Sequence, residues 1–411
     1  MKRLSGAWLI LGGLLLGLAV GALLAAVAPA RAPQVAAVAD PIGGIWLDAL
    51  RMTIVPLVFA LLVQGVGVAA EAAEAGGVTA RAMLVFALVL LTSALVGAIV
   101  YPLLLDLFPL NPAAAAALRG GLASAEPVPT IPPIGEWLRS IIPANPVKAA
   151  ADSAMLPLVI FALIFGFAAS RISVGGRTAI MDLMAAITDT MLVIVRWVLA
   201  FAPLGVFALG LATAARTGLA AIGGLAHYLA LYLVILAIVT AGGYVLAVLF
   251  GRQPFGRFAR AALPAQSIGL STQSSLAALP AMIDAARGPL GLGEEKPAIV
   301  LPMAVALMRA TSPAANLGIV LYVAMLAGVT PGLTAMIAGT LVAAVISLAS
   351  VSIPSTVTFF ITTVPIALAM GVPLAPLALF VAVEQIPDLL RTVGNVTYDL
   401  AATTVAARRR S

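Results

Sequence analysis

Long runs of apolar residues, separated by short charged segments, cover most of this 411-residue chain. A helix needs about 20 apolar residues to cross the hydrocarbon core of a bilayer. Charge-free runs of about this length or longer occur at residues 4–30, 52–70, 82–105, 153–170, 197–215, 217–251 and 310–383. The last run has 74 residues, which would make a single helix of about 110 Å, so it must turn inside the membrane or cross it more than once. The pattern predicts an all-α polytopic membrane protein.

The first apolar run, residues 4–30, allows two interpretations. Lys2 and Arg3 before it and small residues before Arg31 are also typical of a secretory signal peptide. The run is long for such a peptide, so we favour a first membrane helix. Short cytoplasmic loops are enriched in Lys and Arg, and placing Lys2 and Arg3 in the cytoplasm puts most later basic loops there too. We therefore expect a protein of the bacterial cytoplasmic membrane, in contact with its lipids, with both termini cytoplasmic.

The composition excludes several classes of protein. Apolar residues make up 63% of the chain and charged residues only 9%, against roughly 25% charge in a soluble domain. A soluble enzyme, a disordered chain and a nucleic-acid-binding protein are therefore excluded. The chain has no cysteine and one histidine, His227, so it has no thiolate nucleophile and no His-rich metal centre. We expect no enzymatic activity and no bound cofactor.

Five polar residues follow one another along the last long helix, predicted over 374–407. At 100° per residue, they fall within a stripe about 80° wide. The stripe consists of Glu384, Asp388, Arg391, Asn395 and Asp399. Such residues are costly in lipid, so they must face a cavity or the protein interior. The stripe could be a structural ladder of salt bridges, with Asp388 pairing Arg391, or a site for an anionic or zwitterionic solute with a cation beside it.

Three segments interrupt the apolar sequence with polar residues or proline. Residues 267–280 and 347–365 are rich in Ser and Thr, which indicates two re-entrant hairpins related by an inverted repeat. Packing of membrane helices through Ser and Thr is the alternative. Between them, Pro313 predicts a break in a helix over 296–325, because proline clashes with the carbonyl of residue 309 and leaves that oxygen available to a ligand.

These segments resemble one family over nearly the whole chain. The sequence DLLRTVGNVTYD at 388–399 resembles the last helix of the dicarboxylate/amino acid:cation symporters, the glutamate-transporter homologues. STQSSLAALP at 271–280 and SIPST at 352–356 resemble the tips of their two hairpins. Earlier helices resemble theirs at LRMTIVPLVFALLVQG (50–65), LTSALVG (91–97), NPVKAAADSAMLPLVIFALIFG (145–166) and FAPLGVFAL (201–209).

The resemblance implies a homotrimer of elevator-type transporters, each with about eight transmembrane helices and two re-entrant hairpins. Residues 1–100 would supply scaffold helices and the start of the transport domain, 101–148 an extramembrane loop or broken helix, and 149–250 scaffold and peripheral helices. Residues 257–411 would form the transport core. Within it, we expect the first hairpin at 257–287, the broken helix at 296–325, the second hairpin at 332–371 and the last helix at 374–407.

The resemblance also implies roles for particular residues. Arg391 would hold a side-chain carboxylate of the solute, and Asp388 would accept from an α-ammonium group. Further solute contacts would be Thr392, Asn395, Ser274, Ser275, Ser312 and Ile353. Ion coupling would involve Asn395, Asp399, Glu384, Arg309, Thr92, Ser93, Ser347 and Ser350, with a sodium site at Asn395 and Asp399.

The chain departs from the family in its broken helix. The family has Asn-Met-Asp-Gly-Thr there, and its Asn and Asp help to bind sodium, whereas this chain reads Met308-Arg309-Ala310-Thr311-Ser312. Two ion ligands are therefore replaced, and a guanidinium stands between them. We expect Arg309 to take the place of one sodium ion, and any remaining coupling to use H⁺, with Glu384 as carrier, or Na⁺.

The sequence leaves two solutes open. An acidic amino acid such as aspartate or glutamate would pair its ammonium group with Asp388, whereas a C4-dicarboxylate would be repelled by that carboxylate. We favour the amino acid and keep the dicarboxylate as the alternative. A structural or sensory membrane protein is disfavoured because five buried polar groups are costly to maintain.

Overall fold

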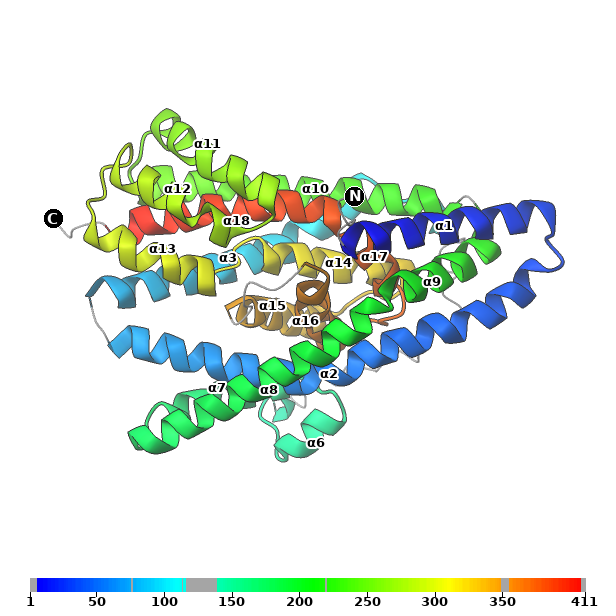
Figure 1. The fold of residues 1–411 in the computed structure, drawn as a ribbon, viewed down its shortest axis with the longest axis horizontal. Coiled ribbons are helices and arrows are strands. Elements are labelled where there is room, and N and C mark those ends of the chain that lie inside the picture. The colour runs from blue at the N-terminus through cyan, green and yellow to red at the C-terminus, as the bar shows by residue number, and fades with distance from the viewer. Residues whose placement is uncertain are drawn as a thin grey trace.

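The computed structural model describes residues 6–74, 77–112, 114–115, 139–218, 220–348 and 355–407, and within these ranges every regular element is a helix (Figure 1). The helices of the first half are α1 (Gly6–Val27), α2 (Ala32–Glu74), α3 (Gly77–Leu107), α6 (Pro146–Ala151), α7 (Met155–Ala169), α8 (Val174–Ala200), α9 (Ala202–Thr217) and α10 (Ala220–Val245). The helices of the second half are α11 (Phe255–Thr272), α12 (Ser275–Arg287), α13 (Glu295–Leu307), α14 (Ser312–Ala327), α15 (Leu333–Leu348), α16 (Ser355–Ala369), α17 (Leu377–Val383) and α18 (Gln385–Ala406).

Six segments of the described chain are helical, long and apolar enough to cross a membrane. They are Leu9–Val27, Ala32–Glu71, Gly77–Leu107, Val174–Ala200, Gly223–Phe250 and Glu295–Ala327. Three shorter apolar helices accompany them, at Met155–Ala169, Leu333–Leu348 and Thr358–Ala369. The last helix, α18, is not among the six because its polar face lowers its hydropathy. The chain is therefore a polytopic helical membrane protein, as the apolar pattern predicts.

One predicted span is wrong in its boundaries. Residues 197–215 do not form one helix, because α8 ends at Ala200 and α9 begins at Ala202, with Pro203 in its first turn. A proline fits the first turn of a helix but not the interior. The span Val174–Ala200 lies before this break and was hidden in the sequence by its charged residues. The predicted loop at 101–148 begins later than expected, since α3 continues to Leu107, and most of it lies outside the described residues.

The N-terminal helix α1 packs along α9 by close approach of the two backbones (Figure 1). Gly13, Gly17 and Gly21 recur every four residues and therefore share one face of α1. A Cβ atom on any of them would collide with a backbone carbonyl oxygen of α9. Small residues at this spacing let membrane helices approach closely and gain dispersion contacts. We call this contact the glycine seam; it contains no charged residue.

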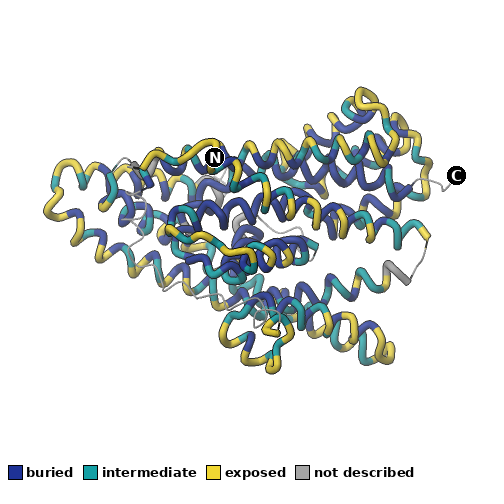
Figure 2. Tube along the Cα trace, turned by 180° about the vertical axis from the view of Figure 1, so that it is seen from behind, coloured by how far each residue is buried: buried dark blue, intermediate teal, exposed yellow. Residues whose placement is uncertain are grey.

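Helices α14 and α18 are buried along most of their length, among helices from both halves of the chain (Figure 2). Helix α18 packs against α10, α11, α12, α13 and α3. The segments predicted as hairpins are two pairs of packed helices, α11 with α12 and α15 with α16. The polar stripe of α18 therefore lies inside the protein. We call the stripe and the part of the chain packed around it, from the break before α14 to α18, the polar core.

Candidate functional site

The break predicted in the helix over 296–325 is confirmed, at Met308–Thr311 between α13 and α14. Asn395 of α18 holds the break in place, because its Oδ1 accepts hydrogen bonds from the backbone N–H (3.0 Å) and the hydroxyl (2.9 Å) of Thr311. The carbonyl of Arg309 was expected to be free for a ligand. Instead it accepts a hydrogen bond from the N–H of Ser312 at 2.9 Å, because the chain tightens into a turn before α14.

A second break separates α17 from α18 at Glu384. Pro387 accounts for it, because a proline clashes with the carbonyl four residues earlier, at Val383, where α17 ends. The last helix, predicted as one element over 374–407, is therefore divided into α17 and α18. As a result, the Glu384 side chain begins the buried stripe at a helix terminus.

Arg391 lies where the two breaks meet, and all four of the contacts described for its guanidinium are with the protein itself. Nη1 forms an ion pair with Glu384 Oε1 at 2.5 Å and donates to the hydroxyl of Tyr232 at 3.2 Å. Nη2 donates to Ser312 Oγ at 3.0 Å and to Asn316 Oδ1 at 2.9 Å. Tyr232 in turn donates to Glu384 at 3.0 Å. The salt-bridge partner of Arg391 is thus Glu384 and not Asp388, which was the pair expected from helical spacing.

Asp388 lies one turn before Arg391 and is only partly buried. Arg391 and Arg309 are the positive charges that act on its carboxylate. Thr392, beside it, donates its hydroxyl to the Asp388 carbonyl at 2.9 Å. The stripe therefore carries a partly buried carboxylate next to a buried guanidinium, which is an arrangement that suits a solute with both an ammonium and a carboxylate group.

The tip between α11 and α12 reaches the start of α18. Gln273, in the left-handed conformation with φ 54°, and Gln385 join their side chains by a hydrogen bond, and Gln273 also donates to the Gln385 carbonyl at 3.3 Å. Ser274 caps α12 by accepting from the N–H of Ala277 at 3.2 Å, and Ser275 follows in its first turn. The N-termini of α12 and α18 are therefore neighbours. A helix N-terminus favours a negative charge.

Deeper along α18, Asp399 is completely buried, and neither of its carboxylate oxygens has a hydrogen-bond partner. Ser93 of α3 is also buried with an unpartnered hydroxyl. Its neighbour Thr92 lies on the exposed side of α3. Of these two candidate ion-coupling residues on α3, the structure therefore brings only Ser93 into the interior.

The second predicted tip lies partly outside the described residues. Ser350 and Ile353 belong to that part, so the structure does not place them. Ser347, at the end of α15, is fully buried and donates to the Ala343 carbonyl at 2.8 Å. His227, which the sequence left without a role, contacts the hydroxyl of Tyr322 at 3.0 Å and the Phe108 carbonyl at 2.8 Å.

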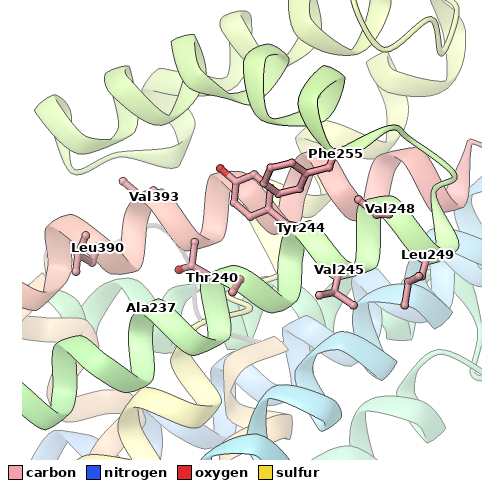
Figure 3. Close-up of a pocket in the computed structure, with 10 residues that line it drawn as sticks. Ala237, Thr240, Tyr244, Val245, Val248, Leu249, Phe255, Leu390 and Val393 are labelled. Carbon is pink, nitrogen blue, oxygen red and sulfur yellow. The ribbon is translucent and has the colours of Figure 1, made fainter.

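A large apolar cavity lies on another side of α18 and does not contain the polar stripe. It has a volume of about 730 Å³ and is lined by residues of α10, by the π-helical turn Leu246–Phe250, by Phe255, and by Leu390 and Val393 of α18 (Figure 3). Thr240 and Tyr244 are its only lining residues with a side-chain polar atom. A charged solute is not stabilised by such a lining.

Sequence reasoning missed several residues of the site. Tyr232 and Asn316 both contact the Arg391 pair or its guanidinium, and Thr311 fixes the break through Asn395. Tyr232 and Asn316 belong to no polar stripe, and Thr311 was named only as part of the broken segment. An isolated buried amide in an apolar helix such as α14 is the one signal that could have pointed to Asn316.

The fold and this region together define a polytopic α-helical membrane protein that encloses buried charges where two of its helices are broken. The chain belongs to the sodium:dicarboxylate symporter family, whose family model matches residues 7–409. This is a family of membrane transporters and not of enzymes.

Individual relatives are distant and carry different names. The chain is 27% identical over 252 residues to the proton/glutamate-aspartate symporter of Escherichia coli (strain K12), covering 58% of this chain and 57% of the relative. It is 26% identical over 226 residues to the proton/sodium-glutamate symport protein of Bacillus caldotenax, covering 53% and 51%. It is 26% identical over 306 residues to the C4-dicarboxylate transport protein of Solibacter usitatus (strain Ellin6076), covering 70% and 66%. The matches therefore span about half to two thirds of these relatives.

Proposed function

We propose that this protein is a secondary active transporter that carries a small acidic solute, an acidic amino acid such as aspartate or glutamate, across the membrane. The observation that carries the proposal is the guanidinium of Arg391, which is 4% exposed and lies where two broken helices meet. A buried guanidinium at helix N-termini is well suited to bind a carboxylate, because it offers a planar pair of donors.

Solute binding at Arg391 takes place by exchange of partners. On the Nη2 side, the guanidinium donates to two neutral oxygens, those of Ser312 and Asn316. A carboxylate of the solute forms stronger, charge-assisted hydrogen bonds than these neutral acceptors. It therefore displaces them, while Glu384 keeps the Nη1 side in place.

Asp388 distinguishes an amino acid from a dicarboxylate. Its carboxylate lies one turn from Arg391 and is accessible enough to accept from an α-ammonium group. The N–H groups and hydroxyls of Ser274 and Ser275 bind the α-carboxylate, and Thr392, Asn395 and the second tip at Ile353 complete the site.

We further propose that the polar core moves as the transport domain of an elevator. Its two helix pairs, α11 with α12 and α15 with α16, enter the membrane as re-entrant hairpins, and the outer helices form the scaffold of a homotrimer. Coupling uses H⁺ or Na⁺, with Glu384, Asn395, Asp399, Ser93, Thr92, Ser347 and Ser350 as candidate residues. The protein resides in the bacterial cytoplasmic membrane with both termini in the cytoplasm.

A C4-dicarboxylate is the second candidate solute, and one observation favours it. The charge of Arg309 acts on Asp388, so this carboxylate is partly compensated and repels a second anion less than the sequence suggests. Relatives named as C4-dicarboxylate transport proteins are as similar to this chain as those named for glutamate.

Uptake into proteoliposomes tests both candidates. The purified protein is reconstituted and given labelled aspartate, glutamate or succinate, with a proton gradient or a sodium gradient imposed separately. We expect aspartate or glutamate to accumulate and unlabelled succinate to compete weakly. Accumulation of succinate in preference to both amino acids would assign the second function, and no uptake of any of the three would reject the proposal.

A further inference from the structure

We propose that Arg309 is a permanent countercharge for Asp399, so that this deep carboxylate needs no dissociable cation when the polar core binds its solute. The inference deepens the proposed function, on which it rests for its transport consequence. It assigns Arg309 as a positioning residue, not as a contact of the solute.

The carboxylate of Asp399 requires a positive charge near it. The residue is 0% exposed, and both oxygens lack a hydrogen-bond partner in the described structure. A buried unpaired carboxylate is strongly unfavourable unless a proton, a metal cation or a basic side chain compensates it. Ser93, on helix α3 that packs against α18, also has a buried hydroxyl without a partner.

Arg309 is the one charged group of the described chain that acts on Asp399. The other guanidinium of the polar core, that of Arg391, is already paired with Glu384 at 2.5 Å. The Nε atom of Arg309 is buried and has no hydrogen-bond acceptor. The polar core thus contains a guanidinium, that of Arg309, with a buried unpartnered Nε, and a carboxylate, that of Asp399, with two buried unpartnered oxygens.

The two groups are close enough to interact and yet are not in contact. The charge of Arg309 acts on both Asp388 and Asp399, which lie eleven residues apart on α18, but no nitrogen of Arg309 lies within 4.0 Å of an oxygen of either. Arg309 therefore acts on both ends of the stripe: on Asp388, where we propose that the solute binds, and on the completely buried Asp399. The hydrogen bonds between Asn395 and Thr311 order the break in which Arg309 stands.

A guanidinium fixed to the chain and a sodium ion that can dissociate predict different effects of sodium on solute affinity. If a sodium ion compensated Asp399, solute affinity would rise with the sodium concentration. With Arg309 as countercharge, the deep site is already neutral, and solute affinity is insensitive to sodium there. Removing the guanidinium leaves Asp399 with free oxygens in a buried, polar space, which is a site that suits a small hard cation.

Solute binding by the purified full-length protein tests this inference. Affinity for aspartate and for succinate is measured in sodium chloride and in choline chloride of equal ionic strength. We expect less than about a twofold difference for the wild type, and at least about a tenfold loss in choline, restored by sodium, for Arg309→Met, because the carboxylate is then unpaired. Arg309→Lys keeps the charge and is expected to behave like the wild type.

Two further variants complete the design. Arg260→Met removes an exposed arginine of α11 and is the matched control, with no expected change. The double variant Arg309→Met/Asp399→Asn removes both charges, and it should bind solute equally in both salts. A steep sodium dependence of the wild type, or an Arg309→Met variant that binds like Arg260→Met in choline, would overturn the inference.

Thermal unfolding provides a readout that does not depend on the solute. In choline we expect Arg309→Met to unfold at a lower temperature than the wild type, and either sodium or the added Asp399→Asn change to restore it. If the wild type binds neither solute, the proposed function fails while this comparison still decides the inference. Equal unfolding temperatures of the wild type and Arg309→Met in choline would reject Arg309 as a countercharge.

Discussion

The glycine seam and the polar core are both tightly packed, but they are held together by different physics. In the glycine seam, α1 and α9 meet backbone to backbone through Gly13, Gly17 and Gly21. In the polar core, α18 and α14 meet through the hydrogen bonds of Arg391 with Ser312 and Asn316, beside the buried ion pair of Arg391 with Glu384. The glycine seam contains no charged residue and is stabilised by van der Waals packing of two closely approaching backbones.

The difference between the glycine seam and the polar core indicates which region carries the function. A buried ion pair contributes little net stability, since desolvation of its charges offsets their attraction. The buried charges of the polar core therefore add little to the stability of the fold, whereas the glycine seam contributes to it through helix packing. Substitutions in the seam should change stability without changing solute affinity, and substitutions in the core should change affinity.

Loss of Arg391 is expected to have the largest effect. Arg391→Ala removes the anion-binding group and leaves Glu384 buried and unpaired, which costs about 3–5 kcal/mol of stability. Affinity for acidic solutes should fall at least about 100-fold, and Arg391→Lys should retain weak binding because it keeps the charge but not the planar fork. Calorimetry and thermal unfolding measure the two effects.

Adding Glu384→Gln to Arg391→Ala separates stability from binding. The double variant has no unpaired carboxylate, so its stability should recover while its binding does not. Wild-type affinity in Arg391→Ala would contradict the assignment of the site.

The glycine seam is expected to respond in the opposite way. Gly17→Ala places a methyl group against the Phe207 carbonyl and should lower the stability by about 1–3 kcal/mol through overpacking. Gly12→Ala is the matched control, because nothing lies within 4 Å of a Cβ there, and alanine favours the helix. Both variants should bind solute as the wild type does. A loss of affinity in Gly17→Ala without a loss of stability would show that the two regions are not separate.

Asp388→Asn is expected to change selectivity rather than stability. Asp388 is partly buried and forms no ion pair within 4.0 Å, so its replacement by the amide of similar shape should cost little stability. Affinity for aspartate should fall by about tenfold, or 1.4 kcal/mol, while affinity for succinate stays the same or improves. Competition of both solutes for one labelled ligand measures this, and an equal loss for both would contradict a role in amino-acid selection.

The smallest expected effect is at the tip between α11 and α12. Gln273→Ala removes the hydrogen bonds to Gln385, each worth about 1 kcal/mol, and should weaken solute binding by about fivefold through a less ordered tip. Gln253→Ala is the control, because Gln253 lies before the other end of α11 and bonds the Leu290 carbonyl rather than α18. Faster solute dissociation in stopped-flow measurements is the expected signature, and an unchanged rate would separate the tip from the site.

Much of this architecture follows from the sequence because membrane helices obey strict local rules. The apolar runs predict the membrane class, Pro313 predicts the break before α14, and the spacing of the stripe predicts the buried face of α18. The pairing within the stripe is different, because helical spacing places both Glu384 and Asp388 near Arg391, and the structure pairs Nη1 of Arg391 with Glu384. The span α8 was missed because its charges mask an otherwise apolar helix.

The tertiary partners were beyond the reach of sequence patterns. Tyr232 and Asn316 come from separate helices, and nothing in their own segments indicates that they meet at Arg391. The exposure of Thr92 beside the buried Ser93 depends on how α3 rotates against α14 and α18. These facts are set by packing between elements and not by periodicity within one.

Pro387 matters for any design that grafts the polar face of α18 onto another helix. Glu384 lies at the boundary between α17 and α18, and its carboxylate meets the guanidinium of Arg391 at 2.5 Å. Pro387 sets this boundary, because it removes a backbone donor and clashes with the carbonyl where α17 ends. A graft of the polar face of α18 onto another helix should therefore carry the proline four residues before Arg391 as well as the charged residues.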